Sequence, residues 1–278
     1  MLTQFYIDDL IKNALREDIN YVDVSTDYLF GENQEDDAYF VAKAEGVICG
    51  IDIALRTFEL LDPSFTAEKL VNDGQAVKKG DVIARLHGKT VFLLKGERTA
   101  LNILQHMSGI ATMTAEAVKL TAGTKAQITD TRKTLPSLRP LQKYAVVCGG
   151  GKNHRFNLSD GAMLKDNHID AAGGIENAVK IVRAHLGHMV KIEVETRDLD
   201  EVRQALDSGA EIIMLDNMSL EDMKAAVELV DGRALLEASG NITSETIPRV
   251  AATGVDIISM GALTHSVKAF DISMKFKK

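Results

Sequence analysis

The sequence predicts an α/β protein whose first part mixes helices with short strands and whose second part alternates the two. Three observations predict this class. Helical and strand-like patterns are interleaved up to about residue 125, apolar runs followed by helix-start signals repeat after it, and these runs recur at nearly constant intervals. At 278 residues and 45% hydrophobic, the chain can bury the core of one or two domains.

The first part opens with an amphipathic helix. Its apolar residues follow the i, i+3, i+4 spacing that places them on one face, and they are Ile7, Leu10, Ile11, Ala14 and Leu15. Short apolar runs at 38–43, 82–86 and 91–94 predict strands, and the run at 53–61 predicts a helix. This mixture predicts an α+β unit.

The second part carries six predicted strands, at 126–129, 162–164, 190–194, 211–215, 234–238 and 256–260. The last four are separated by steps of 21, 22 and 22 residues, measured along Val194, Leu215, Glu237 and Ser259. This interval is typical of consecutive β-α units in a parallel barrel or open sheet.

Helix-boundary residues support the same alternation. Asp198 and Ser219 each precede an acidic residue by three positions, which is the spacing of a helix N-cap. Gly209 and Gly232 lie where the following helices should end. We therefore expect a helix after each of these strands.

Parallel α/β folds place their chemistry at the carboxyl ends of the strands. In this sequence those ends carry cations first, carboxylates next and glycine-containing turns last, and the residues are Asp130, Arg132, Lys133, Lys165, Asp166, Glu195, Asp216, Asn217, Ser239, Gly240, Asn241 and Gly261. Each alone is compatible with an ordinary polar loop. Together they predict an active site on one rim of the sheet.

The turns at 239–241 and 260–262 have the composition of phosphate sites. Glycine lets backbone N–H groups approach phosphate oxygens, and a helix N-terminus after the turn favours negative charge. A plain strand-to-helix turn also contains glycine. We expect phosphate, because barrels commonly bind it in the turns after their last strands.

Charge is distributed unevenly along the chain. The net charge is −8, yet the segment 131–165 carries +6 and the remainder −14. Lysines scattered along a helix would indicate only a solvated face. In this segment arginines and a histidine stand beside glycines and threonines, which predicts close packing around bound anions.

The composition excludes several other classes. The negative net charge argues against general nucleic-acid binding, and no apolar run approaches the roughly 20 residues that span a bilayer. The N-terminal sequence lacks the charged start and apolar block of a signal peptide, so we expect a cytoplasmic protein. Cys49 and Cys148 are too few for a disulfide framework or a four-thiolate zinc site, and we expect buried free thiols.

Several long motifs, in one order, resemble the quinolinate phosphoribosyltransferase (nicotinate-nucleotide pyrophosphorylase) family. They are ERTALN at 97–102, SGIAT at 108–112, DTRKT at 130–134, KYAV at 143–146, GGGKNHR at 149–155 and LKDNH at 164–168. Earlier, ED at 17–18, DVST at 23–26 and GVICG at 46–50 also resemble the first domain of that family. The likeness covers nearly the whole chain.

The resemblance implies a fold. It is an N-terminal α/β sandwich at 1–110, joined by a returning C-terminal strand at 268–278, and an incomplete parallel α/β barrel at 111–267. It also implies transfer of phosphoribosyl from phosphoribosyl pyrophosphate to quinolinate, which yields nicotinate mononucleotide, pyrophosphate and CO2 in de novo NAD biosynthesis. Homodimers, or a higher oligomer, are implied, in which a neighbouring chain donates Arg98.

The resemblance and the chemistry of the substrates together assign residues to roles. Planar guanidinium and other cationic groups suit the two carboxylates of quinolinate, and the candidates are Arg98, Arg132, His154, Arg155 and Lys165. Phosphoribosyl pyrophosphate is expected to contact Thr131, Lys133, Glu195, Asp216, Ser239, Gly240, Asn241, Met260, Gly261, Ala262 and His265. Substrate-bound Mg²⁺ is expected to face Glu195 and Asp216. The catalytic residues are expected to be Lys133, Lys165, Glu195 and Asp216, acting by positioning and electrostatics.

Three alternatives compete with this interpretation. The first is a sister transferase of the same fold that uses nicotinate or another anionic base. The second is a Schiff-base aldolase, with Lys133 or Lys165 at a strand end as the nucleophile. The third is a sensor that binds a phosphorylated metabolite without chemistry. The number of arginines favours quinolinate over the first.

Overall fold

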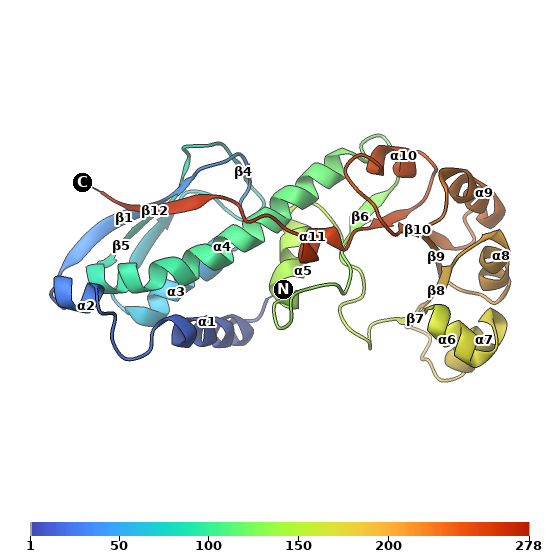
Figure 1. Ribbon diagram of the computed structural model, residues 1–278, viewed down its shortest axis with the longest axis horizontal. Helices are drawn as coiled ribbons and strands as arrows, with labels where there is room; N and C mark the ends of the chain where they lie inside the picture. The colour runs from blue at the N-terminus through green and yellow to red at the C-terminus, as the bar shows by residue number, and fades with distance from the viewer. Residues whose placement is uncertain (1, 278) are drawn as a thin grey trace. The chain divides into compact units, whose positions relative to one another are not determined.

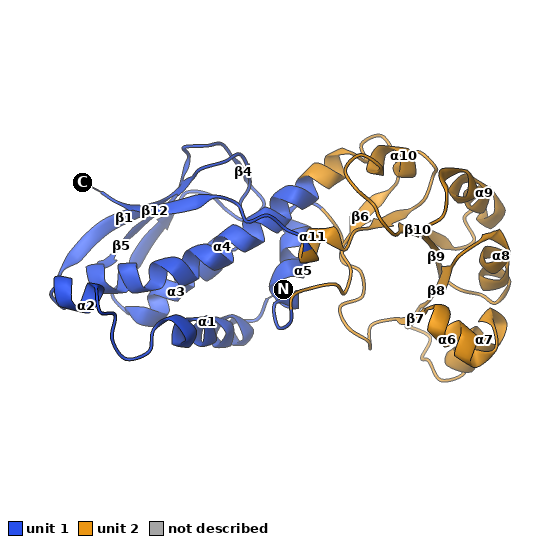
Figure 2. Cartoon of the chain, viewed as in Figure 1, with its two compact units in different colours: residues 1–115, 136–150, 266–278 blue, residues 116–135, 151–265 orange. Residues whose placement is uncertain are grey.

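The computed structural model describes residues 2–277 and divides into two compact units (Figures 1 and 2). The first unit comprises residues 1–115, 136–150 and 266–278, and the second comprises 116–135 and 151–265. The expected boundary between residues 110 and 111 falls inside one long helix, α4 (Thr90–Lys119). The last residues of that helix belong to the second unit.

The first unit is built on a four-stranded antiparallel sheet in the order β12-β1-β5-β3. In β1 the burial alternates, so Ala38, Phe40 and Ala42 face the core while their neighbours do not. Helices α3 and α4 lie along this sheet (Figure 1). The elements are α1 (Gln4–Asp18), α2 (Thr26–Leu29), β1 (Glu35–Ala42), β2 (Gly46–Val47), α3 (Ile51–Leu61), β3 (Thr66–Lys69), β4 (Ala76–Val77), β5 (Val82–Lys89), α4, α5 (Arg139–Cys148) and β12 (Ile272–Phe276).

One predicted strand of this unit is wrong. The run at 91–94 forms the start of helix α4, not a strand. The buried residues Leu93, Ala100, Leu101 and Leu104 recur at helical spacing, so the apolar run is one turn of a longer amphipathic pattern. The predicted helices at the N-terminus and at 53–61 are confirmed as α1 and α3, and the strands at 38–43 and 82–86 as β1 and β5.

The C-terminal strand returns to the first unit, as the resemblance implies. Strand β12 pairs antiparallel with β1 in a register that runs from Ala42 opposite Ile272 to Ala38 opposite Phe276. Ile272 and Met274 are buried in the core of this unit. Segments from opposite ends of the sequence therefore share one hydrophobic core.

The second unit is a six-stranded parallel sheet in the order β6-β11-β10-β9-β8-β7, and β6 and β7 are its two edges. The sheet therefore does not close, which confirms the incomplete barrel. Helices α7, α8 and α9 lie on its outer side (Figure 1). The elements are β6 (Gln127–Thr129), β7 (Ala162–Leu164), α6 (Asp166–Ala172), α7 (Ile175–Arg183), β8 (Ile192–Thr196), α8 (Leu199–Asp207), β9 (Ile212–Asp216), α9 (Leu220–Val230), β10 (Leu235–Ser239), α10 (Ile247–Ala251), β11 (Ile257–Ser259) and α11 (Ala262–His265).

The predicted helix boundaries of this unit are confirmed. The side chain of Asp198 accepts a hydrogen bond from the Glu201 N–H at 2.9 Å, and that of Ser219 accepts from the Asp222 N–H at 3.1 Å. Gly209 adopts a positive φ of 79° two residues beyond the end of α8, which is a conformation that glycine tolerates without strain.

None of the helices within residues 2–277 is long and apolar enough to cross a membrane.

Candidate active site

A pocket of about 310 Å³ lies in the second unit, at the carboxyl ends of its parallel strands. Nine of the residues that the sequence assigned to substrate binding line it, and four further residues join them. The thirteen residues are Thr131, Arg132, Lys133, His154, Arg155, Met163, Lys165, Glu195, Met214, Asp216, Glu237, Ser239 and Ser259. The pocket therefore joins the cationic segment 131–165 to the acidic and polar strand ends.

The strands supply this pocket in two layers, because every second side chain of a strand points to the same face. Lys165, Glu195, Asp216 and Ser239 lie at or just beyond the ends of four strands. Two positions earlier, a lower layer contains Met163, Glu193, Met214 and Glu237, all of which except Glu193 line the pocket. This lower layer was missed in the sequence, although the alternation that marks it is visible there.

The segment after β6 is fixed to the segment before β7 by one buried acid. The two carboxylate oxygens of Asp130 accept hydrogen bonds from the His154 N–H at 2.9 Å and from Asn153 Nδ2 at 2.6 Å. The Lys152 N–H also donates to the Ile128 carbonyl at 2.8 Å. These contacts bring the DTRKT and GGGKNHR motifs together, so that cations from both face one pocket.

Arg155 is half-buried on the pocket wall. Its guanidinium donates to the Gly161 carbonyl at 3.1 Å, and Nη2 lies 3.5 Å from the sulfur of Met163. Burial lowers the pKa of Arg155, and the positive charge of nearby Arg132 lowers it further. Two mutually repelling guanidinium groups in a recess form a site that an anion would stabilise.

His154 lies between two buried acids. Its Nε2 is 3.1 Å from Glu193 and 3.5 Å from Glu237, whose side chains are 5% and 2% exposed. Burial is the largest single influence and lowers the pKa of His154, but the two carboxylates together outweigh it and raise the pKa to about 10.

The hydrogen bond at the other ring nitrogen of His154 favours the neutral form of the ring. Nδ1 accepts this bond from the Arg155 N–H at 2.8 Å. Burial also raises the pKa of Glu193, yet the combined effect of the two acids keeps the pKa of His154 well above neutral. We therefore take His154 as an imidazolium near neutral pH, a state in which Nδ1 carries a proton and no longer accepts from the Arg155 N–H. It then adds a further positive charge to the pocket.

The rim of the pocket carries two carboxylates on adjacent strands. Glu195 accepts a hydrogen bond from Lys165 Nζ at 2.7 Å, and Asp216 accepts one from Asn217 Nδ2 at 3.0 Å. Lys165 is therefore engaged with a carboxylate instead of lying in the apolar setting that activates a Schiff-base lysine. The carboxylate oxygens are hard ligands of the kind that Mg²⁺ prefers, so the donor set fits a substrate-bound magnesium ion.

The two glycine turns lie at different distances from the next helix. Helix α11 begins at Ala262, directly after Gly261, whereas α10 begins at Ile247, six residues after Asn241. A helix therefore follows each turn, as expected, directly after the second turn and only after a longer connection from the first. The longer connection at 240–246 separates that turn from its helix.

A side chain on either glycine would have to displace a neighbouring side chain. A Cβ on Gly240 would lie 2.2 Å from Asn217 Oδ1, and one on Gly261 would lie 2.9 Å from Lys133 Cδ and 3.1 Å from the ring of His265. Gly240, Asn241, Met260, Gly261, Ala262 and His265 are not among the residues that line the pocket. These contacts nevertheless place Gly261 beside Lys133 and His265.

Buried polar atoms without a hydrogen-bond partner gather here. Within residues 2–277 they include Thr129 Oγ1, Arg155 Nε and Ser259 Oγ, and the last two belong to pocket residues. Leaving such an atom unsatisfied costs about 1–3 kcal/mol. Their concentration at one place indicates a site that polar ligand atoms or ordered water complete.

Arg98 is the one predicted quinolinate ligand that the structure does not assign to the pocket. It lies on helix α4 within the first unit, is exposed, and is not a lining residue. Its predicted donation by a neighbouring chain stays a prediction.

Comparison with known families identifies the group of proteins to which these features belong. The model of the quinolinate phosphoribosyl transferase N-terminal domain matches residues 23–108, and that of the C-terminal domain matches residues 110–275. The chain belongs to the quinolinate phosphoribosyltransferase family. A probable nicotinate-nucleotide pyrophosphorylase [carboxylating] of Bacillus subtilis is 48% identical over 95% of this chain and 91% of its own length.

Other members of the family extend this likeness. The chloroplastic nicotinate-nucleotide pyrophosphorylase [carboxylating] of Arabidopsis thaliana is 46% identical over 96% of this chain and 81% of its own length. The crystal structure of NadC from Streptococcus pyogenes matches with a TM-score of 0.96 at 44% identity, over 100% of this chain and 99% of that chain. Human nicotinic acid phosphoribosyltransferase matches with a TM-score of 0.57 at 14% identity, over 99% of this chain and 74% of that chain, which shows a shared fold alone.

Proposed function

We propose that this member of the quinolinate phosphoribosyltransferase family transfers phosphoribosyl from phosphoribosyl pyrophosphate to the ring nitrogen of quinolinate. The products are nicotinate mononucleotide, pyrophosphate and CO2, and the reaction is a step of NAD biosynthesis. One observation carries the proposal: Arg132, His154 and Arg155 line a single pocket. Two lysines and two rim carboxylates line it as well, and they are Lys133, Lys165, Glu195 and Asp216. The names of the relatives support it.

Quinolinate binds on the cationic wall. Its two adjacent carboxylates suit the paired guanidinium groups of Arg132 and Arg155, with His154 and Lys165 completing the neutralisation. A dianion offsets more of the repulsion between the two arginines than nicotinate does, because nicotinate has a single carboxylate. The wall therefore favours quinolinate over the base of a sister transferase.

Phosphoribosyl pyrophosphate binds toward the rim. Thr131 and Lys133 face its phosphates, together with Ser239 and the glycine turns at 239–241 and 260–262. Glu195 and Asp216 face the ribose hydroxyls and the magnesium ion that the substrate carries. This division places the cations on the anionic groups and the carboxylates beside the sugar.

The chemistry needs no covalent nucleophile from the protein. The lone pair of the quinolinate nitrogen forms a bond to the sugar carbon as the bond from that carbon to pyrophosphate breaks. Lys133 and the substrate-bound Mg²⁺ offset the negative charge of the departing pyrophosphate. Glu195 and Asp216 stabilise the positive charge that develops on the sugar. The carboxylate beside the ring nitrogen then leaves as CO2, and a proton takes its place on the carbon.

Three further features complete the proposal. The chain forms a homodimer, and Arg98 of each protomer enters the site of its neighbour, because Arg98 is exposed on α4 and does not line the pocket of its own chain. Magnesium enters as part of the substrate. The protein acts in the cytoplasm.

Arginine substitutions test the assignment of the quinolinate wall. We expect Arg132→Ala and Arg155→Ala each to lower kcat/KM for quinolinate by at least about 100-fold, because each removes a charge-assisted bond to a carboxylate in a recessed site. The measurement is the rate of nicotinate mononucleotide formation, with folding checked by circular dichroism. Arg203→Ala, an exposed site on α8, is the matched control. Near wild-type kcat/KM in either pocket variant would overturn the assignment.

A further inference from the structure

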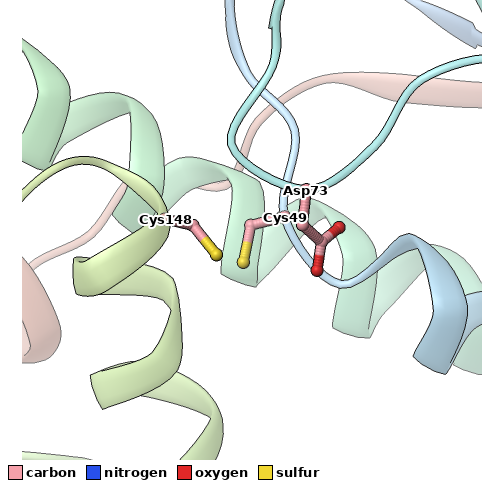
Figure 3. A group of neighbouring side chains, drawn as sticks. All are labelled: Cys49, Asp73 and Cys148. Atoms are coloured by element: carbon pink, nitrogen blue, oxygen red, sulfur yellow. The ribbon is translucent and has the colours of Figure 1, made fainter. Parts of the chain in front are cut away.

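A second cluster of reactive side chains lies in the first unit, and none of its residues lines the pocket. Cys49, Asp73 and Cys148 bring two sulfur atoms and a carboxylate oxygen within 4.8 Å of one another. Figure 3 shows the two sulfur atoms pointing toward each other, with the carboxylate of Asp73 beside Cys49. They come from the segment before α3, the loop before β4 and the end of α5.

Cys49 is held in place through its backbone. Its N–H donates to Ser108 Oγ at 2.9 Å, and its carbonyl accepts from the same hydroxyl at 3.2 Å. Cys49 is fully buried, as is Ser108 on helix α4. The backbone of Cys49 is therefore fixed to helix α4.

Cys148 is held by close packing of helices α5 and α4. It is the last residue of α5, and a Cβ on the following Gly149 would lie 2.4 Å from the Ala111 carbonyl oxygen and 2.6 Å from Thr114 Cβ. The end of α5 therefore approaches α4 so closely that only glycine fits. Both thiols are anchored to the same long helix, and their proximity is a built feature of the unit.

Asp73 has structural partners that account for it without a metal ion. Its Oδ1 accepts hydrogen bonds from the N–H groups of Gly50 and Ile51 at 2.9 and 3.0 Å, at the start of α3. Its Oδ2 accepts from the Tyr144 hydroxyl at 3.0 Å. Because both oxygens are already engaged, the cluster is better understood as a thiol pair than as a three-ligand metal site.

We propose that Cys49 and Cys148 are an oxidisable pair, which a peroxide converts to an intramolecular disulfide. The Cys148 thiolate attacks one peroxide oxygen, the O–O bond breaks, and hydroxide leaves, giving a sulfenic acid. The Cys49 sulfur then attacks the oxidised sulfur, and the sulfenic oxygen leaves with the Cys49 proton as water. In total two thiols and one hydrogen peroxide give one disulfide and two molecules of water.

The two cysteines differ in burial and in thiol pKa, as a sequence in which Cys148 is oxidised first and Cys49 attacks second requires. Cys148 is half-buried, and a hydrogen bond from the Cys49 thiol lowers its pKa, although burial and the nearby Asp73 carboxylate oppose this. Burial raises the pKa of Cys49. Cys148 is therefore the peroxide-reactive thiol and Cys49 the resolving one. Their sulfur atoms lie within 4.8 Å and must approach to about 2.05 Å, so the disulfide requires side-chain rotation and a small backbone shift.

The test treats the purified full chain with hydrogen peroxide and maps its peptides without reduction. We expect a Cys49–Cys148 linked peptide, loss of both free thiols, an intact mass lower by two hydrogens, and reversal by dithiothreitol. The disulfide closes a long loop, so the oxidised protein should also melt higher, by on the order of 5 °C.

Single substitutions separate the roles of the two thiols. In Cys49→Ser, Cys148 should stop at a sulfenic acid that dimedone traps, and in Cys148→Ser, Cys49 should stay reduced. Thermal melting of both variants establishes that they fold. Oxidation of wild-type Cys148 to sulfinic acid with no linked peptide would overturn the proposal. Stoichiometric zinc in the purified protein, with both thiols blocked until a chelator removes it, would also overturn it and assign a metal site instead.

Discussion

At the scale of single residues, the pH response of the site is set by His154 and the acids around it. Glu193 and Glu237 raise the pKa of His154 from 6.5 to about 10, against the effect of burial. A raised pKa in the folded state stabilises the protein most below the unfolded value, and this contribution is lost as the pH rises through about 10. Quinolinate affinity should fall over the same alkaline range, because the pocket loses a positive charge.

Glu193→Gln tests this account. The amide keeps the shape of the carboxylate but removes a charge that raises the pKa of His154, so the alkaline fall in kcat/KM for quinolinate should move to lower pH. The KM for phosphoribosyl pyrophosphate should change little. The measurement is a pH profile of both parameters, with Glu221→Gln, an exposed site in the first turn of α9, as the control. An alkaline limb at the same pH in Glu193→Gln and wild type would contradict the role given to His154.

The pocket residues that end a strand were predictable from the sequence, and the layer beneath them was not. Glu195 and Asp216 follow apolar runs and stand out. Glu193 and Glu237 lie inside such runs, where a charged residue looks like an interruption of a core strand. Only their pairing with His154, which is distant in sequence, explains why two charges are buried there.

At the scale of elements, the alternation of strands and helices in the second unit was predictable because each boundary has a local chemical cause. The N-caps at Asp198 and Ser219 and the glycine ends of the helices are short-range features. The strand predicted at 91–94 was wrong because four apolar residues fit a strand and a helix equally well. Only the spacing of apolar residues along the whole thirty-residue helix identifies the segment as helical. The strands also extend slightly further than predicted, so Glu195 and Asp216 lie within β8 and β9.

Asp198→Ala tests a helix boundary. The side chain of Asp198 accepts the Glu201 N–H at the start of α8, and removing it should lower the free energy of unfolding by about 1 kcal/mol. Urea unfolding of the purified variant measures this change. Arg203→Ala loses only an exposed ion pair with Asp200 on the same helix. It should lower the free energy of unfolding by only about a few tenths of a kcal/mol. Equal stability of Asp198→Ala and wild type would contradict the capping role.

At the scale of the whole molecule, the strand β12 could be placed only through the family resemblance, since nothing local links residues 272–276 to β1. The same holds for Arg98, whose predicted role depends on a second chain. The cationic wall of the pocket was visible from charge alone, but its contacts are set by Asp130, a buried residue that ties two distant motifs together.

Mixing two inactive variants tests whether sites are shared between chains. Arg98→Ala and Arg132→Ala should each be inactive alone. In a two-fold dimer that exchanges Arg98, a mixed dimer has one site with both substitutions and one with neither, so unfolding and refolding the mixture should restore about a quarter of wild-type activity. Arg132→Ala mixed with Arg155→Ala is the control and should stay inactive, because both residues lie in the same pocket. Failure of the first mixture to regain activity would exclude donation in trans.

In the proposed function, the cationic pocket selects a pyridine dicarboxylate for phosphoribosyl transfer. The most direct measurement combines the purified protein with phosphoribosyl pyrophosphate, Mg²⁺ and either quinolinate or nicotinate, and monitors nicotinate mononucleotide, pyrophosphate and CO2. Quinolinate should give the three products in equal amounts, and nicotinate should give none. Turnover of nicotinate without turnover of quinolinate would contradict the claim.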